Sequence, residues 1–194
     1  MNTQTHVLMG AALFGSTLSG GQTAAAVAGG LAPDLPLILM VLGARWIERR
    51  SPREIFGKLY FSATWQRWLA PWHSLPMWGG GLGFGWAAAS PVAMAFAASG
   101  LVHAVIDLFL HVDDAHQHFW PFSAWRFRSP VSYWDPRHHG RLFRPFELVL
   151  AVGLTVQLLI QHHSLWAITG LCAVLTFYLA QIAYVMKAFS RRAP

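Results

Sequence analysis

Charged residues and cysteine are both scarce in this chain. Charged side chains make up 11% of its 194 residues, against about a quarter in an average soluble domain. Together with a hydrophobic fraction of 55%, this argues against a water-exposed surface and favours one integral-membrane domain spanning residues 1–194. Cys172 is the only cysteine and lies in an apolar run, which excludes a disulfide framework and a thiolate metal site. Any metal must therefore be bound by His, Asp and Glu.

The basic residues give a net charge of +6 and cluster beside apolar runs rather than along one surface. One cluster lies in residues 48–72, a second in residues 112–146, and a third at the C-terminus. This distribution is typical of the positive-inside rule, and we predict that all three segments are cytoplasmic. No base-stacking motif accompanies the charge, so we expect no nucleic-acid partner.

Apolar runs separated by short breaks predict an all-α bundle of about five or six membrane helices. The expected helical runs are 7–19, 22–32, 35–47, 74–90, 91–112, 147–160 and 164–187. The first two are short for a full span and form either a helical hairpin or one broken helix. With the basic loops on one side, His73, Asp107 and His111 fall near the same membrane face. A polar site is expected there.

The run from Pro91 to Val112 carries three ionisable residues. His103, Asp107 and His111 follow one another at i, i+4 spacing and therefore share one face of a helix. An ionisable group at membrane depth costs roughly 2.5–3.5 kcal/mol or more, so such a stripe needs a compensating partner. One possibility is a metal ion bound by imidazole and carboxylate. The other is a histidine–carboxylate hydrogen bond that fastens two helices together.

Further histidines and acidic residues gather where the expected helices meet loops. Asp34 lies between two prolines, and such a rigid turn fixes the direction of its carboxylate. The segment from His111 to His118 is dense enough in His and Asp for a metal-binding tract. His and carboxylate ligands suit zinc, manganese or iron. Arginines of the adjacent loop are candidates to bind a phosphate or anionic lipid; they are Arg126, Arg128, Arg137 and Arg141.

A series of short motifs runs in order through residues 5–123. They are Thr5-His6, Gly30-Leu31-Ala32-Pro33-Asp34, Trp72-His73-Ser74, His103-Ala104-Val105-Ile106-Asp107 and Phe119-Trp120-Pro121-Phe122-Ser123. Their order resembles the membrane-bound metal-dependent hydrolase family, also described as LexA-binding inner-membrane hydrolases. That family is in turn distantly similar to zinc-dependent phospholipase C and single-strand nucleases. The resemblance implies a place in the bacterial inner membrane.

The resemblance also implies a set of metal ligands. The core ligands would be His6, Asp34, His73, His103 and Asp107. The remaining ligands would come from His116 or His118, His139 and Glu147. They would bind one to three divalent ions, zinc above all, with manganese or iron as alternatives. Asp34 would double as the base that acts on the activated water. Two positions depart from the family pattern: Pro36 stands where a second Asp is usual, and Trp68 where an earlier His falls.

We therefore expect a membrane-embedded, metal-dependent hydrolase that cleaves a phosphoester-type bond of a lipid-like phosphorylated substrate, with membrane lipids as its surroundings. Two alternatives stay open. One is a membrane protein that binds or transports a metal ion without catalysis. The other is a structural or regulatory membrane protein whose histidines only pair with carboxylates. A transporter would spread its ligands along a path through the bilayer, whereas the candidate ligands here gather toward one end.

Overall fold

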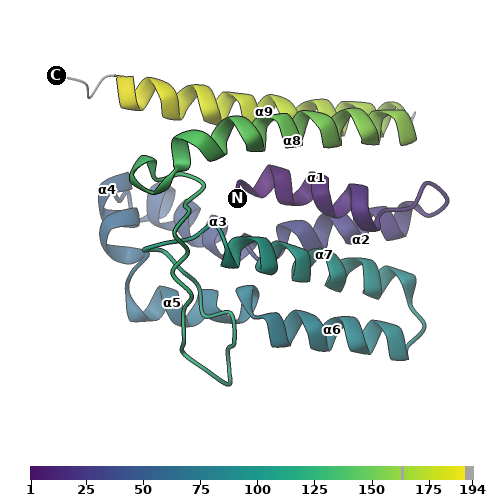
Figure 1. The fold of residues 1–194 in the computed structure, drawn as a ribbon, viewed down its shortest axis with the longest axis horizontal. Helices are drawn as coiled ribbons and strands as arrows, with labels where there is room; N and C mark the ends of the chain where they lie inside the picture. Colours follow the sequence, from purple (N-terminus) through teal and green to yellow (C-terminus); the bar gives the residue numbers. More distant parts are fainter. Residues whose placement is uncertain (163, 191–194) are drawn as a thin grey trace.

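The computed structural model describes residues 1–162 and 164–190, and these are helical with connecting loops and no β-strand (Figure 1). The α-helices are α1 (Thr3–Phe14), α2 (Gly20–Leu31), α3 (Leu35–Leu42), α4 (Pro52–Glu54), α5 (Ala63–Leu69), α6 (Leu75–Ala87), α7 (Pro91–Leu108), α8 (Gly140–Gln161) and α9 (Leu165–Ser190). Short π- or 3₁₀-helical turns are η1 (Gly43–Ile47), η2 (Ile55–Leu59), η3 (Ala70–His73) and η4 (Pro136–His138). The all-α prediction is confirmed. The basic residues Arg191 and Arg192 lie outside the described residues.

Serine caps set the beginnings of the two central helices. The hydroxyls of Ser74 and Ser90 each accept a hydrogen bond from a backbone N–H of the first helical turn, and a proline follows within that turn. Both features favour a helix start. The central helix ends at Leu108, so the expectation that it runs to Val112 was wrong. His111 consequently lies in the loop just beyond α7 rather than on it.

Among the described residues, two helices, α7 and α8, are long and apolar enough to cross a membrane. A third candidate arises if α2 and the helical segment Leu35–Ile47 count together as one span; the two are bent by 61° at the break between them. The first apolar runs form a hairpin of two 12-residue helices rather than one broken helix. Helices of that length fall short of the roughly 20 residues that a span needs. Two helices of this kind favour a membrane protein, and the described residues contain fewer of them than the five or six expected.

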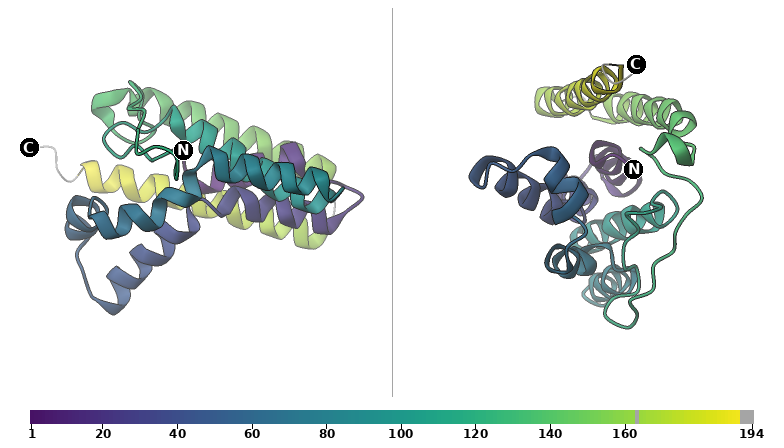
Figure 2. Two further views of the ribbon diagram at one scale, coloured as in Figure 1. Left: turned by 90° about the horizontal axis from the view of Figure 1, so that it is seen from below. Right: turned by 90° about the vertical axis from the view of Figure 1, so that its left-hand side faces the viewer.

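Glycines let α1, α2 and α7 pack closely. A Cβ atom added to Gly29 would lie 2.9 Å from the backbone carbonyl carbon of Phe96, and one added to Gly30 would lie 2.7 Å from the carbonyl oxygen of His6. Real side chains could not fit there without displacing backbone, so small residues at these positions permit the contact. The right-hand view of Figure 2 looks along the bundle from the end that is at the left of Figure 1. The close approach brings His6 on α1 next to His103 on α7.

The polar segments share one end of the bundle. Residues 48–72, the loop 109–139 and the C-terminal end of α9 lie at the left of Figure 1, near the start of α1, and the tight turn between α6 and α7 lies at the right. The long loop is fastened to the helices: the Tyr60 hydroxyl donates to the Asp114 carbonyl at 3.1 Å, and the Leu75 N–H donates to the His118 carbonyl at 2.8 Å. The histidines and carboxylates are held at this end.

Candidate metal centre

Four side chains from separate parts of the chain converge where α7 ends. Asp34 comes from the turn before α3, His73 from η3, and His103 and Asp107 from α7; one ligand atom of each lies within 4.8 Å of all the others. Nε2 of His103 is 3.2 Å from Asp107 Oδ2 and 3.7 Å from Asp34 Oδ1. Nε2 of His73 is 3.6 Å from the same Asp107 oxygen. We call these four residues the first group.

A second group shares Asp107 with the first. It consists of Asp107, His111 and His116, whose ligand atoms also lie within 4.8 Å of one another. Nε2 of His111 is 3.4 Å from Asp107 Oδ2. The ring of His116 stacks on that of His73, with centroids 3.7 Å apart and planes within 5°. The Asp107 carboxylate therefore lies between the two groups.

The ligand-atom distances fit a metal ion. Zinc bonds of about 2.0–2.2 Å in a tetrahedron place neighbouring ligand atoms roughly 3.3–3.6 Å apart. The distances from Asp107 Oδ2 to Nε2 of His103, His73 and His111 are 3.2, 3.6 and 3.4 Å. These separations are too long for ordinary hydrogen bonds of about 2.7–3.2 Å in two of the three cases. They are the spacing that a shared cation requires.

Buried histidine nitrogens without hydrogen-bond partners also support a metal site. Nδ1 of His103 lies 2.8 Å from the Gly30 carbonyl oxygen, and Nδ1 of His118 lies 3.1 Å from the His116 carbonyl oxygen. A carbonyl only accepts, so in each ring Nδ1 carries the proton and Nε2 presents a lone pair. Both Nε2 atoms, and both ring nitrogens of His73, are buried without a hydrogen-bond partner. Each such atom costs roughly 1–3 kcal/mol, and a cation bound by the first group would remove that cost for one nitrogen of His73 and for Nε2 of His103.

Burial favours the neutral form of two of the three histidines in the loop that follows α7. Burial, assisted by the neighbouring His73, lowers the pKa of His118 to about 4 and holds the pKa of His116 well below its ordinary value. Burial also lowers the pKa of His111, but the nearby Asp107 carboxylate and the hydrogen bond to Asp114 outweigh it and raise the pKa to about 9, so a metal that binds there displaces a proton. Neutral imidazole is the form that binds metal.

Asp114 orients His111. Its Oδ2 atom accepts from Nδ1 of His111 at 2.8 Å and from Nε1 of Trp134 at 3.0 Å. Burial raises the pKa of Asp114, while these hydrogen bonds lower it by more, so that the carboxyl is ionised. A carboxylate on one ring nitrogen leaves the other nitrogen directed at a metal in many metalloproteins. Nε2 of His111 accordingly faces Asp107.

His6 adjoins the first group on the far side of Asp107. Its Nε2 atom lies 3.0 Å from Asp107 Oδ1, and the amino group of Met1 lies 2.6 Å from the same oxygen. The His6 ring stacks on His103, with centroids 3.5 Å apart. One oxygen of Asp107 thus faces α1, and the other faces His73, His103 and His111.

The structure brings most of the predicted ligands together, but not all of them. Asp34, His73, His103, Asp107 and His116 belong to the two groups, and His6 adjoins them. His118 is buried next to His116, with ring centroids 6.0 Å apart, yet it belongs to neither group. His139 is exposed at the start of α8 and also belongs to neither. His111 does belong, although the resemblance did not assign it; its signal was the i, i+4 spacing after Asp107.

The carboxylate of Glu147, a predicted ligand, lies among hydrogen-bond donors at the start of α1. Its fully buried carboxylate accepts hydrogen bonds from the Asn2 backbone N–H at 2.6 Å, from Asn2 Nδ2 at 2.8 Å and from the Thr5 hydroxyl at 3.0 Å. It is in neither group of candidate ligands. These contacts account for a charge inside the apolar helix α8, and they fasten the start of α1, which carries His6.

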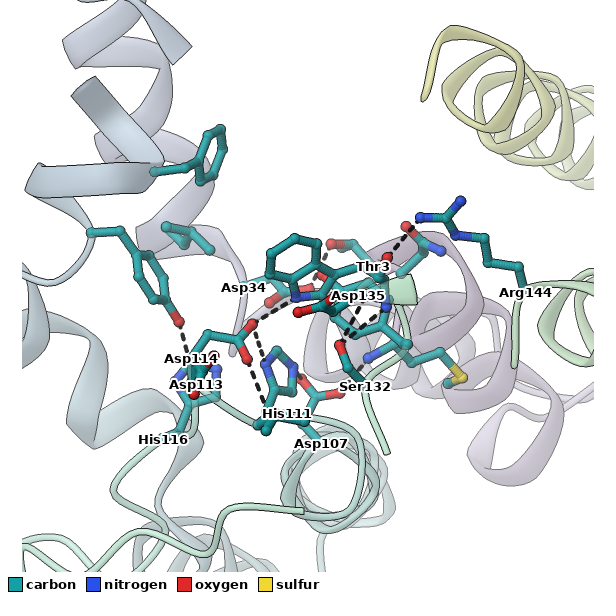
Figure 3. A pocket seen from close by; sticks show the side chains of 18 of the residues that line it. Thr3, Asp34, Asp107, His111, Asp113, Asp114, His116, Ser132, Asp135 and Arg144 are labelled. Carbon is teal, nitrogen blue, oxygen red and sulfur yellow. Dashed lines mark hydrogen bonds and ion pairs between the residues drawn. The ribbon is translucent and has the colours of Figure 1, made fainter. Parts of the chain in front are cut away.

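A cavity of about 730 Å³ opens beside the two groups (Figure 3). The group members that line it are Asp34, Asp107, His111 and His116; His73 and His103 do not. Part of its wall is apolar and comes from the helices and turns that follow Asp34; these residues are Leu37, Ile38, Phe56 and Phe61. Its volume is in the range of pockets that hold small molecules.

Three of the four arginines named as candidates for phosphate binding are paired within the protein. Arg126 donates to the Gln66 side chain at 2.8 Å and to the Ala115 carbonyl at 2.6 Å, and Arg128 donates to Asp113 at 3.0 Å. Arg137 lines the cavity but donates to both oxygens of Asp135, which holds the pKa of that carboxyl well below its ordinary value. These pairings favour a structural role in the loop over phosphate binding.

Comparisons of the chain with protein-family models, with curated proteins and with solved structures gave no match. The resemblance to the membrane-bound metal-dependent hydrolases therefore rests on the short motifs alone. What the structure adds is spatial: the motif residues Asp34, His73, His103 and Asp107, separated by up to 73 positions along the chain, meet within 4.8 Å.

Proposed function

We propose that the protein is a membrane-embedded, metal-dependent hydrolase that cleaves a phosphoester-type bond of a lipid-like phosphorylated substrate. The observation that carries the proposal is the convergence of buried, unpartnered imidazole nitrogens and carboxylates beside a cavity with an apolar wall. Membership of the hydrolase family that the motifs resemble is part of this proposal.

The first group is suited to hold a divalent ion. His73, His103 and two carboxylates offer nitrogen and oxygen donors, a set that favours zinc and also accepts manganese or iron. Such an ion, once bound, supplies a Lewis acid that activates water near neutral pH and polarises a phosphoryl oxygen. The side chains contribute fixed positions, because the Gly30 carbonyl orients His103 and helix packing orients Asp107.

Asp34 is placed to act as the base. Its side chain is 14% exposed, against 2% for Asp107, and both residues line the cavity. The Thr3 hydroxyl donates to Asp34 Oδ2 at 2.5 Å, which fixes the carboxylate, while Oδ1 faces His73 and His103. A water molecule in the cavity can reach this carboxylate and give up a proton to it.

The cavity wall supports an amphiphilic substrate. Leu37, Ile38, Phe56 and Phe61 offer an apolar surface for a hydrocarbon chain, and the carboxylates and imidazoles lie at the polar part. Bound cations would reverse the negative charge of that part and attract a phosphate. We assign this end to the cytoplasmic side of a bacterial inner membrane, an assignment that the basic residues of its loops support through the positive-inside rule. In this proposal α1, α6 and α9 accompany the two long helices within the bilayer.

The test combines metal analysis with hydrolysis assays on detergent-purified protein. We expect elemental analysis to find a transition metal near stoichiometric amounts, and His103→Ala and Asp107→Ala to remove most of it, with His139→Ala as the matched control. Phosphodiester and phosphomonoester lipids should be hydrolysed by the wild type in a chelator-sensitive way. Bound metal without turnover on a broad lipid panel would instead identify a non-catalytic metal-binding protein. Absence of metal binding would leave a structural or regulatory role, with histidines that only pair with carboxylates.

A further inference from the structure

The two groups of ligands differ in their access to the cavity. His73 and His103 of the first group are fully buried and do not line it. All three members of the second group, Asp107, His111 and His116, do line it. A substrate that enters the cavity therefore contacts the second group directly. Of the first group it contacts only the carboxylates, Asp34 and Asp107.

The groups also differ in how many ligands the chain supplies. The first has four, which is enough to complete a tetrahedral shell; the second has three. Zinc sites with four protein ligands are closed and structural, whereas catalytic sites keep three protein ligands and one open position. By this criterion an ion in the first group would have to expand its shell to take up water, whereas an ion in the second group would keep a position for a substrate beside the cavity that its three ligands line.

The second group has its own supporting contacts. Asp114 fixes the tautomer of His111 and is itself held by Trp134 Nε1 at 3.0 Å and by the Val112 N–H at 3.2 Å. His116 is fixed by stacking on His73. Asp107 links the two groups, since its Oδ2 atom is 3.2 Å from Nε2 of His103 and 3.4 Å from Nε2 of His111. Paired ions in hydrolases lie about 3.5–4 Å apart, which a bridging carboxylate can span.

We infer that a second divalent metal ion binds to Asp107, His111 and His116, that Asp107 bridges it to the ion of the first group, and that its open position receives the substrate. The part of this inference that concerns the substrate rests on the proposed function. The inference adds a metal site in which His111, which is not one of the family-motif residues, is a ligand. Asp114 is a positioning residue for that site.

The experiment measures metal stoichiometry, independently of activity. The metal-free full-length protein is titrated in detergent with Co²⁺, followed by visible absorption, and the bound metal is then counted by elemental analysis. We expect two ions per chain in the wild type and one in His116→Ala. Retention of the first ion in His116→Ala shows that the variant is folded. His139→Ala, which changes an exposed histidine outside both groups, should keep two ions.

Asp114→Asn supplies a milder variant. It retains the size of the side chain but loses the ionised acceptor for His111, and changes of such outer partners cost 10–100-fold in metal affinity. We expect the second ion to bind 10–100-fold more weakly and the first with unchanged affinity. With Mn²⁺, electron paramagnetic resonance should show a coupled pair in the wild type and an isolated ion in His116→Ala.

Either of two results would overturn the inference: saturation of the wild type at one ion per chain, or equal stoichiometry and affinity in the wild type and His116→Ala. The outcome is separable from that of the proposed function. Hydrolysis by a protein that saturates at one ion would overturn the paired site and support the function. Two ions without hydrolysis would support the paired site and overturn the function.

Discussion

Replacing Glu147 by glutamine distinguishes an anchor of α1 from a metal ligand. The carboxylate accepts from the Asn2 N–H and the Thr5 hydroxyl through Oε1, and from Asn2 Nδ2 through Oε2. Glutamine keeps the oxygen at the Oε1 position but replaces Oε2 by an NH₂ group, which then faces the side-chain NH₂ group of Asn2. That amide cannot turn freely, because Gln181 Nε2 donates to Asn2 Oδ1 at 3.0 Å.

The size of the effect follows from these contacts. Hydrogen bonds to a charged group contribute about 1.5–3 kcal/mol each, so loss of one of the three predicts that Glu147→Gln destabilises the protein by roughly 2 kcal/mol. For a chain of this length, 1 kcal/mol shifts Tm by about 2–4 °C, which gives a fall of roughly 4–8 °C. Glu147→Ala removes all three bonds, and its Tm should fall further.

The measurement is thermal unfolding of the metal-free protein in detergent, followed by tryptophan fluorescence, together with metal stoichiometry. Glu48→Gln is the control, because Glu48 is exposed and a surface ion pair contributes about 0–1 kcal/mol. We expect Glu147→Gln to lower Tm and to bind as much metal as the wild type. An unchanged Tm with loss of a metal ion would refute the anchoring role and make Glu147 a ligand.

Three further substitutions test the packing and the site. Gly30→Ala should destabilise by about 1–3 kcal/mol and weaken metal binding, since the added Cβ would lie 2.7 Å from the His6 carbonyl oxygen; Gly20→Ala, in open space, should do neither in the same unfolding and metal assays. Asp107→Asn should reduce metal content more than His103→Ala, because Asp107 belongs to both groups. Ile38→Trp should lower kcat/KM at least about tenfold for long-chain substrates and less for short-chain analogues, if the apolar wall holds the chain.

The sequence was most informative where rigid local features and motif order coincide. The two prolines around Asp34 and the i, i+4 spacing of His103 and Asp107 predicted side chains with fixed directions, and the structure places these residues in one group with His73. Each of them belongs to a helix or a turn, and nearby proline and serine residues mark where that helix begins or where the chain turns. Local signals of this kind predict the structure well, because the tertiary contacts at these positions agree with them.

The remaining errors concern long-range partners and helix ends. A glutamate inside an apolar helix looks the same in sequence whether it binds a metal or accepts from a backbone N–H 145 positions away, as Glu147 does. His111 was expected on a helix that in fact ends at Leu108, yet the loop returns its ring to Asp107. Fewer helices of spanning length occur among the described residues than the apolar runs indicated, because α1 and α2 form a hairpin of short helices.

Helix packing and ligand geometry depend on the same backbone atoms. Gly30 permits α2 to approach the carbonyl of His6, and the carbonyl of Gly30 fixes the tautomer of His103. The packing thereby directs a lone pair of His103 toward Oδ2 of Asp107. Glu147 holds the start of α1, the helix whose His6 lies against Oδ1 of Asp107. A buried carboxylate in an apolar bundle needs nearby positive charge or hydrogen-bond donors, and imidazoles that present lone pairs cannot donate to it. The Met1 amino group already serves Oδ1 of Asp107. A cation between Oδ2 and Nε2 of His103 would satisfy both of these atoms, so the tautomer that the packing imposes on His103 favours a metal over simple His–Asp pairing.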